Sequence, residues 1–213
     1  MTHQKRKVSL KKSNSKSFAL RFLSAAVLAG ISGMSQADCL ITITSAECDT
    51  SSPNPYSSTL DFSSVTGATV TIDSDAILNT GSNAGITTGD NANIILQSGA
   101  QVISGSKKAA AITTTNDSHI KIGKDALVSQ TNAAQPTINV LFYDNSIENS
   151  GTITNEGSSP AISFDHSGQT LVNDGVISSK GTAISGYGGL TIINSGQIIG
   201  GTGTAILFGA FVQ

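Results

Sequence analysis

The amino-acid sequence predicts an all-β protein in which an exported chain winds into a parallel β-helix of about six coils. Two observations carry this fold class. From about residue 68 the sequence repeats itself with a period of 21 to 26 residues. Within each repeat, short stretches alternate polar with β-branched residues, which is the periodicity of strands rather than of helices. A third observation, the pattern of a secretory signal at the N-terminus, predicts that the repeat lies outside the cytoplasm.

The first 37 residues have the organisation of a secretory signal peptide. Six lysines and arginines lie between positions 5 and 16, and an apolar run follows from Phe22 to Met34. The run ends in Ser35-Gln36-Ala37, with small residues at the two positions that a signal peptidase reads. It is shorter than the roughly 20 apolar residues that span a bilayer as a helix, so a membrane anchor fits less well. We therefore expect cleavage after Ala37 and export to the periplasm, the cell surface or the medium.

The mature chain would be acidic and would contain no arginine. Five lysines and fourteen acidic residues lie between Asp38 and Gln213, which gives this part of the chain a formal charge of −9. Phosphate backbones would repel such a chain. We therefore expect that nucleic acid is not a partner.

Two cysteines, Cys39 and Cys48, lie just beyond the expected cleavage site. In an oxidising compartment such a pair usually closes a disulfide. A redox or metal pair is the alternative, but neither C-x-x-C spacing nor a nearby histidine supports it. We expect residues 38 to 67 to form an N-terminal cap with this disulfide loop, followed by β-helix repeats over residues 68 to 213.

Two independent marks keep the same period along the repeats. The first is a polar turn before a short apolar strand, and the second is a small residue before an isoleucine. The third residue of the turn lies at positions 75, 99, 125, 151, 175 and 196. The isoleucines lie at positions 86, 112, 138, 162, 184 and 206. Because both marks recur together, they predict six stacked coils, each about 4.8 Å from the next.

Inward-facing residues of successive coils should stack into apolar columns. No coil buries its apolar face alone, so the stability of each coil comes from its neighbours. One predicted column contains Ile86, Ile112, Ile138, Ile162, Ile184 and Ile206. A second predicted column contains Ile72, Ile95, Ile120, Ile147, Leu171 and Ile192.

Three asparagines, Asn149, Asn173 and Asn194, recur at one position of the repeat. Stacked amide side chains can form hydrogen bonds from coil to coil. A polar row that binds a ligand is the functional alternative. A structural ladder at a turn is the interpretation that a repeat-locked turn position favours.

The pattern N-S-G-x-I, followed ten residues on by T-A-I, resembles the repeats of autotransporter passengers, the type V secreted proteins of Gram-negative bacteria. The segments that carry the resemblance run from Asn149 to Phe164, from Asn173 to Ser185 and from Asn194 to Leu207. Weaker coils extend it back to about Ala68. The resemblance implies a right-handed β-helix, presented outside the outer membrane as an adhesin-type module. Its expected partners are a host-surface or extracellular-matrix ligand or a glycan.

One departure from that family is large. Autotransporters carry a C-terminal β-barrel of a few hundred residues, whereas this sequence stops at Gln213 within the repeat pattern. We therefore expect the repeats to be truncated, with further coils or the barrel as the missing partner. A terminal coil with bare edge strands should be prone to association.

The sequence offers few groups for catalysis and predicts neither a cofactor nor a metal site. A catalytic triad would need His119 or His166 beside an activated serine, and no G-x-S-x-G elbow is present. The alternative to a non-enzymatic passenger is a polysaccharide hydrolase on a β-helix, which needs paired carboxylates. Asp73 and Asp75 are candidates, although a role in shaping a turn is favoured. The three tyrosines and the absence of tryptophan leave few platforms for stacking sugars.

Overall fold

The computed structural model describes residues 39–50, 54–132 and 134–209, so the expected signal peptide lies outside the described residues. The described residues form strands, turns and irregular segments. None of them belongs to a helix that is long and apolar enough to cross a membrane.

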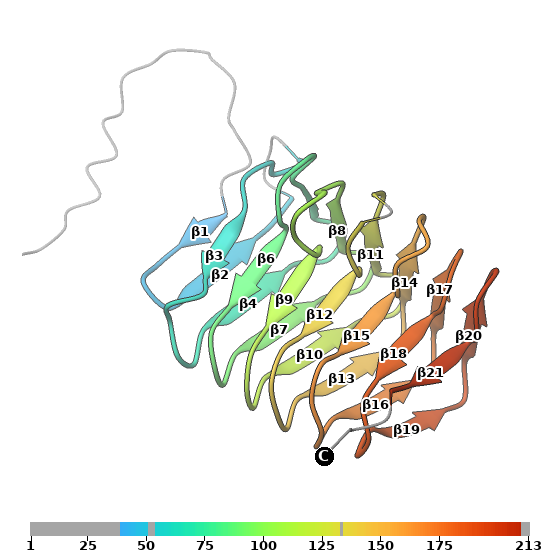
Figure 1. Cartoon of the computed structure of the whole chain (residues 1–213). Coiled ribbons are helices and arrows are strands. Elements are labelled where there is room, and N and C mark those ends of the chain that lie inside the picture. The colour runs from blue at the N-terminus through green and yellow to red at the C-terminus, as the bar shows by residue number, and fades with distance from the viewer. Residues whose placement is uncertain (1–38, 51–53, 133, 210–213) are drawn as a thin grey trace, which may run out of the picture. The chain divides into compact units, whose positions relative to one another are not determined.

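The strands stack into three sheets, here called A, B and C, which wind into a right-handed parallel β-helix of about seven turns (Figure 1). Each full coil contributes one strand to each sheet, in the chain order A, B, C. Short turns join the strands at three corners, which we call A–B, B–C and C–A. The predicted fold class is therefore confirmed.

The strand bounds follow the repeat closely. Sheet A contains β1 (Leu40–Ile41), β2 (Ser45–Cys48), β4 (Thr69–Ile72), β7 (Asn93–Leu96), β10 (His119–Ile122), β13 (Ser146–Asn149), β16 (Thr170–Asn173) and β19 (Thr191–Asn194). Sheet B contains β5 (Ile77–Asn79), β8 (Gln101–Ser104), β11 (Leu127–Gln130), β14 (Thr152–Asn155), β17 (Val176–Ser179) and β20 (Gln197–Gly200). Sheet C contains β3 (Leu60–Phe62), β6 (Ile86–Thr88), β9 (Ile112–Thr114), β12 (Ile138–Val140), β15 (Ile162–Phe164), β18 (Ile184–Gly186) and β21 (Ile206–Phe208).

The N-terminal region combines a small hairpin with the first coil. Strand β1 pairs with β2 in the antiparallel sense, and a disulfide joins Cys39 to Cys48 across this hairpin. Strand β2 then pairs in parallel with β4, and β3 pairs in parallel with β6. The coils therefore begin within residues 38 to 67, where the sequence led us to expect only a cap, and this adds a turn to the expected six.

The isoleucine column of sheet C is confirmed at every position. The registers place the six isoleucines from Ile86 to Ile206 opposite one another, and Leu60 begins the same column in β3. Five of the six are fully buried, and Ile206 in the last described coil is partly buried. The residue that precedes each of the first five isoleucines is buried as well.

The predicted column of sheet A is wrong at its first two residues. Ile72 is buried, but it pairs with Leu96 one column further along. Ile95 points outward, in register with the exposed Lys121. Residues 94 to 96 are all apolar, so alternation cannot show which of them face the core. The observed column contains Val70, Ile94, Ile120, Ile147, Leu171 and Ile192.

The A–B turns shorten along the β-helix, which corrects the alignment of the first repeat mark. Four residues separate β10 from β11, whereas two separate β13 from β14. The strand register pairs Leu127 with Thr152, so Gly151 is aligned with Ala126 and not with Asp125. The residues at positions 75, 99 and 125 each have a positive φ and lie in the longer turns. The mark at positions 151, 175 and 196 is the glycine of the shorter turns.

Candidate functional site

The predicted asparagine ladder lies at the A–B corner of the last three coils. Nδ2 of Asn149 donates to Oδ1 of Asn173 at 2.7 Å, and Nδ2 of Asn173 donates to Oδ1 of Asn194 at 2.7 Å. Oδ1 of Asn149 also accepts from the backbone N–H of Gly151 at 3.2 Å. Asn149 and Asn173 are buried, so these bonds satisfy polar groups that water cannot reach. The geometry therefore gives the ladder a structural role.

The glycines of the N-x-G turns permit this ladder. A Cβ atom at Gly175 would lie 2.1 Å from the carbonyl oxygen of Gly151, and one at Gly196 would lie 2.1 Å from that of Gly175. No side chain fits between turns that stack so closely. The asparagine and the glycine of the motif thus act together, one bonding the corner and the other letting the coils approach.

A second polar column, which the sequence analysis missed, lies at the B–C corner. Its members end the strands of sheet B and donate to carbonyls in the B–C loop of the preceding coil. Oγ of Ser104 donates to the carbonyl of Asn83 at 2.7 Å, and Nδ2 of Asn155 donates to that of Gln135 at 2.8 Å. The side chains of this column differ from coil to coil, so it leaves no periodic signal. Its buried members are Ser104, Gln130, Asn155 and Ser179.

A third polar column lies at the C–A corner, in the loops that lead into sheet A. Oδ1 of Asn145 accepts from the N–H of Ser118 at 2.9 Å, and Oε1 of Gln169 accepts from the N–H of Asn145 at 3.1 Å. Nδ2 of Asn145 donates to the carbonyl of Tyr143 at 3.0 Å, and Nε2 of Gln169 donates to the carbonyl of Phe142. This column therefore fixes the backbone of the loop that contains Phe142 and Tyr143.

The loop fixed in this way presents aromatic rings to solvent. Phe142 and Tyr143 are 44% and 48% exposed. The ring of His166, from the next coil, stacks on Phe142 at a centroid distance of 5.6 Å and lies tilted against Tyr143 at 4.7 Å. We call Phe142, Tyr143 and His166 the aromatic corner. The sequence gives no sign of this corner, because Phe142 and Tyr143 come from one coil and His166 from the next.

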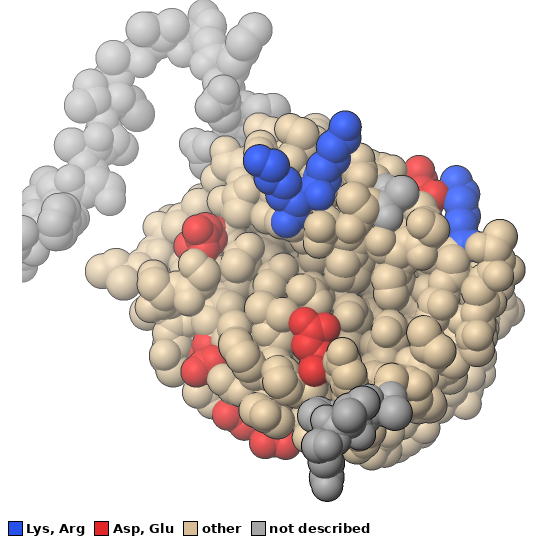
Figure 2. All heavy atoms as spheres, in the orientation of Figure 1, with Lys and Arg blue, Asp and Glu red and all other residues tan. Residues whose placement is uncertain are grey.

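Carboxylates line the same corner in four successive coils. The C–A loops from residues 89 to 169 contain Asp90, Asp117, Asp144 and Asp165, and they contain no lysine. Figure 2 shows several acidic side chains toward the lower edge of the molecule, where these loops lie in Figure 1, and no lysine there; other acidic side chains lie higher on this face, one of them beside a lysine. The corner is therefore acidic as well as aromatic.

Local hydrogen bonds favour the charged form of one of these carboxylates. The side chain of Thr115, together with hydrogen bonds from the side chain and backbone of Asn116, lowers the pKa of Asp90 below its ordinary value of 3.8. Oδ1 of Asp90 accepts from Nδ2 of Asn116 at 3.0 Å and from its N–H at 3.1 Å. Asp90 thus remains charged at any physiological pH.

His119 takes part in a second cluster, on the outer face of sheet A. Its Nδ1 lies 2.8 Å from Oγ of Ser146, and its Nε2 lies 3.9 Å from Oε1 of Glu148. Nζ of Lys121 lies 3.7 Å from Oε2 of the same glutamate. A serine, a histidine and a carboxylate together are the groups of a nucleophilic triad, which also needs donors for an oxyanion. The backbone N–H groups of β10 and β13 already bond to the neighbouring strands on either side, so they offer no donors for an oxyanion. The cluster therefore fits side-chain pairing between neighbouring strands better than catalysis.

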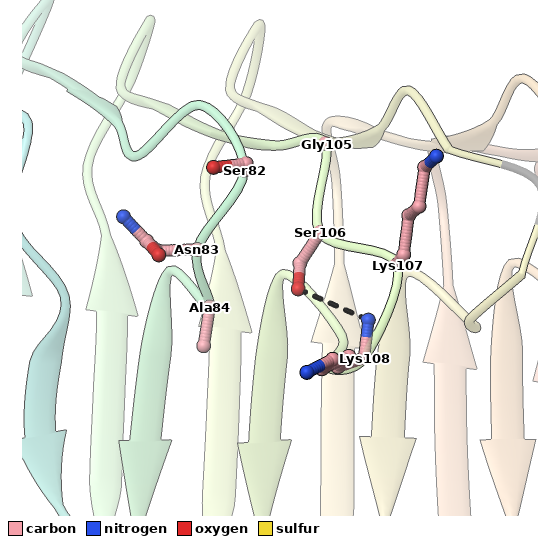
Figure 3. A pocket seen from close by; sticks show the side chains of 7 residues that line it. All are labelled: Ser82, Asn83, Ala84, Gly105, Ser106, Lys107 and Lys108. Atoms are coloured by element: carbon pink, nitrogen blue, oxygen red, sulfur yellow. Dashed lines mark hydrogen bonds between the residues drawn. The ribbon is translucent and has the colours of Figure 1, made fainter.

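A surface hollow of about 460 Å³ lies at the B–C corner (Figure 3). The carbonyl of Asn83 accepts from Ser104, and Oγ of Ser106 accepts from the N–H of Lys108 at 3.2 Å. The charged groups left to a ligand are the exposed ammonium groups of Lys107 and Lys108, which point in different directions in Figure 3. The hollow is lined by Ser82, Asn83, Ala84, Gly105, Ser106, Lys107 and Lys108.

The remaining candidates for chemistry serve the turns. Asp73 and Asp75 both lie in the four-residue turn between β4 and β5, where Asp75 has a φ of 62° and the carbonyl of Asp73 accepts from the N–H of Ala76 at 3.0 Å. Within residues 39–50, 54–132 and 134–209, no three His, Cys, Asp or Glu side chains come together as a metal ion would need.

Comparisons with known proteins found no match to this chain. No family model matches it, and neither a curated protein nor a solved structure shows significant similarity.

Proposed function

We propose that this chain is a passenger-type β-helix module of a Gram-negative autotransporter, exported and displayed at the cell surface as a non-enzymatic adhesin-type scaffold. The observation that carries the proposal is the regular parallel β-helix, with a buried polar column at each of its three corners. Those columns hold the turns in fixed positions from coil to coil. Such a scaffold suits the presentation of surface groups to a partner.

Two further features support export. The disulfide between Cys39 and Cys48 would be stable in an oxidising compartment. The basic segment and apolar run of the first 37 residues have the pattern of a secretory signal. Both agree with the resemblance of the N-S-G-x-I repeats to passenger repeats.

Surface accessibility tests this proposal directly. The chain would be produced in a Gram-negative host, fused after Gln213 to an autotransporter β-barrel, and intact cells would be treated with a protease and with an antibody to the β-helix. We expect labelling and release from intact cells. A matched chain that lacks residues 1 to 37 should remain inside. Protection of the exported chain in intact cells, or polysaccharide hydrolysis by the purified chain, would contradict the proposal.

A further inference from the structure

We propose that the aromatic corner, together with the carboxylates of Asp117 and Asp144, binds the cationic side chains of an extended lysine- or arginine-bearing peptide. The inference deepens the proposed function and rests on it in one respect, because the peptide must meet the module outside the cytoplasm. Four features of the C–A corner support it: the backbone conformation at Phe142, the exposure of the rings, the hydrogen bonds that hold the loop, and the carboxylates of the neighbouring coils.

The backbone at Phe142 shows that its ring is not there to make the turn. Phe142 has a φ of 63°, which a bulky side chain rarely adopts. Every other described residue with a positive φ is aspartate, asparagine or glycine, the residues that tolerate this conformation best. A phenylalanine in this conformation, with 44% of its surface exposed, lies outside the buried core cluster. A surface role for the ring accounts for its position.

The loop is rigid before any partner arrives. The carbonyls of Phe142 and Tyr143 accept from the buried amides of Gln169 and Asn145. The N–H of Tyr143 donates to Oδ1 of Asn116 at 3.1 Å, and its carbonyl also accepts from the N–H of Asp117 at 3.1 Å. A partner would therefore lose little affinity to ordering of this loop.

The carboxylates in the same loops as the rings favour a cation as the ligand. Asp144 follows Tyr143 in the chain, the N–H of Asp117 bonds to the carbonyl of Tyr143, and Asp165 precedes His166. In the part of the chain that the structure describes, none of these aspartates forms an ion pair, since both ion pairs there involve Glu148. The face of an aromatic ring attracts cations, and a row of carboxylates raises their local concentration. A sugar could stack on the rings and donate hydroxyl hydrogen bonds to a carboxylate, but a neutral ligand gains no Coulombic attraction from a row of them. A basic peptide is therefore favoured over a glycan.

Each contact at an exposed site is weak, so the partner should carry several cations. Successive coils repeat about every 4.8 Å and place carboxylates in loops 115–118, 141–145 and 165–169. An extended peptide lying along this corner could engage them one after another. Its binding should weaken as salt rises, because exposed charges are screened.

Fluorescence anisotropy of a labelled oligolysine peptide with the mature chain tests the proposal. Phe142→Asn removes the ring but suits the left-handed backbone, and Asp117→Asn removes one charge in the same way. Asp125→Asn is the matched control, since Asp125 is a left-handed aspartate at the A–B corner. Ile193→Thr is the control for losing an exposed apolar side chain elsewhere.

We expect the wild-type chain to bind the peptide. Affinity should fall about tenfold in Phe142→Asn, and by a smaller factor in Asp117→Asn, while both controls bind as wild type. Equal losses of affinity in Asp117→Asn and Asp125→Asn would show that the peptide responds only to the overall negative charge of the chain, and this would overturn the proposal. Absence of peptide binding, or binding of a neutral oligosaccharide in its place, would overturn it as well. Surface display without peptide binding would leave the proposed function standing, whereas peptide binding by a chain that stays inside the cell would count against the proposed function alone.

Discussion

The buried amides are the side chains whose identity matters most in this β-helix. Asn173 is the middle member of its ladder, bonded to Asn149 on one side and to Asn194 on the other. Its side chain is fully buried, so a lost partner cannot be replaced by water without rearrangement. Charged side chains at the surface contribute much less to stability, because solvent screens them.

Replacing Asn173 with alanine should lower the free energy of unfolding by about 1–3 kcal/mol, because it removes the bond from Nδ2 of Asn149 and the bond to Oδ1 of Asn194. Chemical denaturation followed by circular dichroism measures the change. Asn139→Ala is the matched control, since Asn139 faces outward in β12. An equal effect of the two substitutions would contradict the ladder.

The hydrogen bonds to Asp90 predict a small loss of stability in acid. The pKa of Asp90 is lowered in the folded chain, so the unfolded chain binds its proton more readily. The stabilisation is fully present above about pH 4 and is lost as the pH falls below 3.8 toward the folded-state pKa. Asp90→Asn should flatten the pH dependence of unfolding in that window. Identical slopes in the wild-type chain and in Asp90→Asn would contradict this assignment.

The strands and turns show why the sequence predicted some elements and not others. In sheet C every inward isoleucine follows a small residue, so the column from Ile86 to Ile206 could be read from the sequence alone. Residues 94 to 96 are uniformly apolar, so which of their side chains point into the core depends on the register with strands of the neighbouring coils. The aromatic corner depends on Asn145 and Gln169, which come from different coils and share no sequence pattern. Information of this kind lies in the tertiary packing and not in the local sequence.

A charge placed in the sheet C column should unfold several coils. Ile138 is fully buried between Ile112 and Ile162. Ile138→Asp would bury a carboxylate without a partner, at a cost of about 4 kcal/mol or more. Hydrogen exchange should show lost protection in β9, β12 and β15 together. Thr113→Asp, which points outward in β9, should leave protection unchanged, and a loss confined to β12 would contradict coupling between coils.

The two ends of the described β-helix differ. At the N-terminal end, β1 covers the edge of sheet A and the disulfide holds the hairpin. At the other end, within the described residues, β19, β20 and β21 each pair with a strand on one side only. Ile193, Ile199, Leu207 and Phe208 are exposed there. Bare strand edges beside exposed apolar side chains favour association.

The isolated mature chain should therefore associate through this end. Ile206→Asp combined with Phe208→Lys should shift it toward the monomer, as measured by light scattering, and residues 196 to 208 should exchange hydrogens fastest among the coils. A mass that the double substitution leaves unchanged would contradict the idea. Strong protection of these residues in a monomer would show that this end is capped.

Export of the β-helix is the premise of the proposed function, and the intact mass of chain recovered from outside the cytoplasm under non-reducing conditions tests it. We predict a chain that begins at Asp38 and is two hydrogens lighter than its reduced form, because Cys39 and Cys48 are joined. Alkylation without reductant should find no free thiol. A full-length chain with Met1 and two alkylated cysteines, confined to the cytoplasm, would contradict the exported, surface-displayed β-helix.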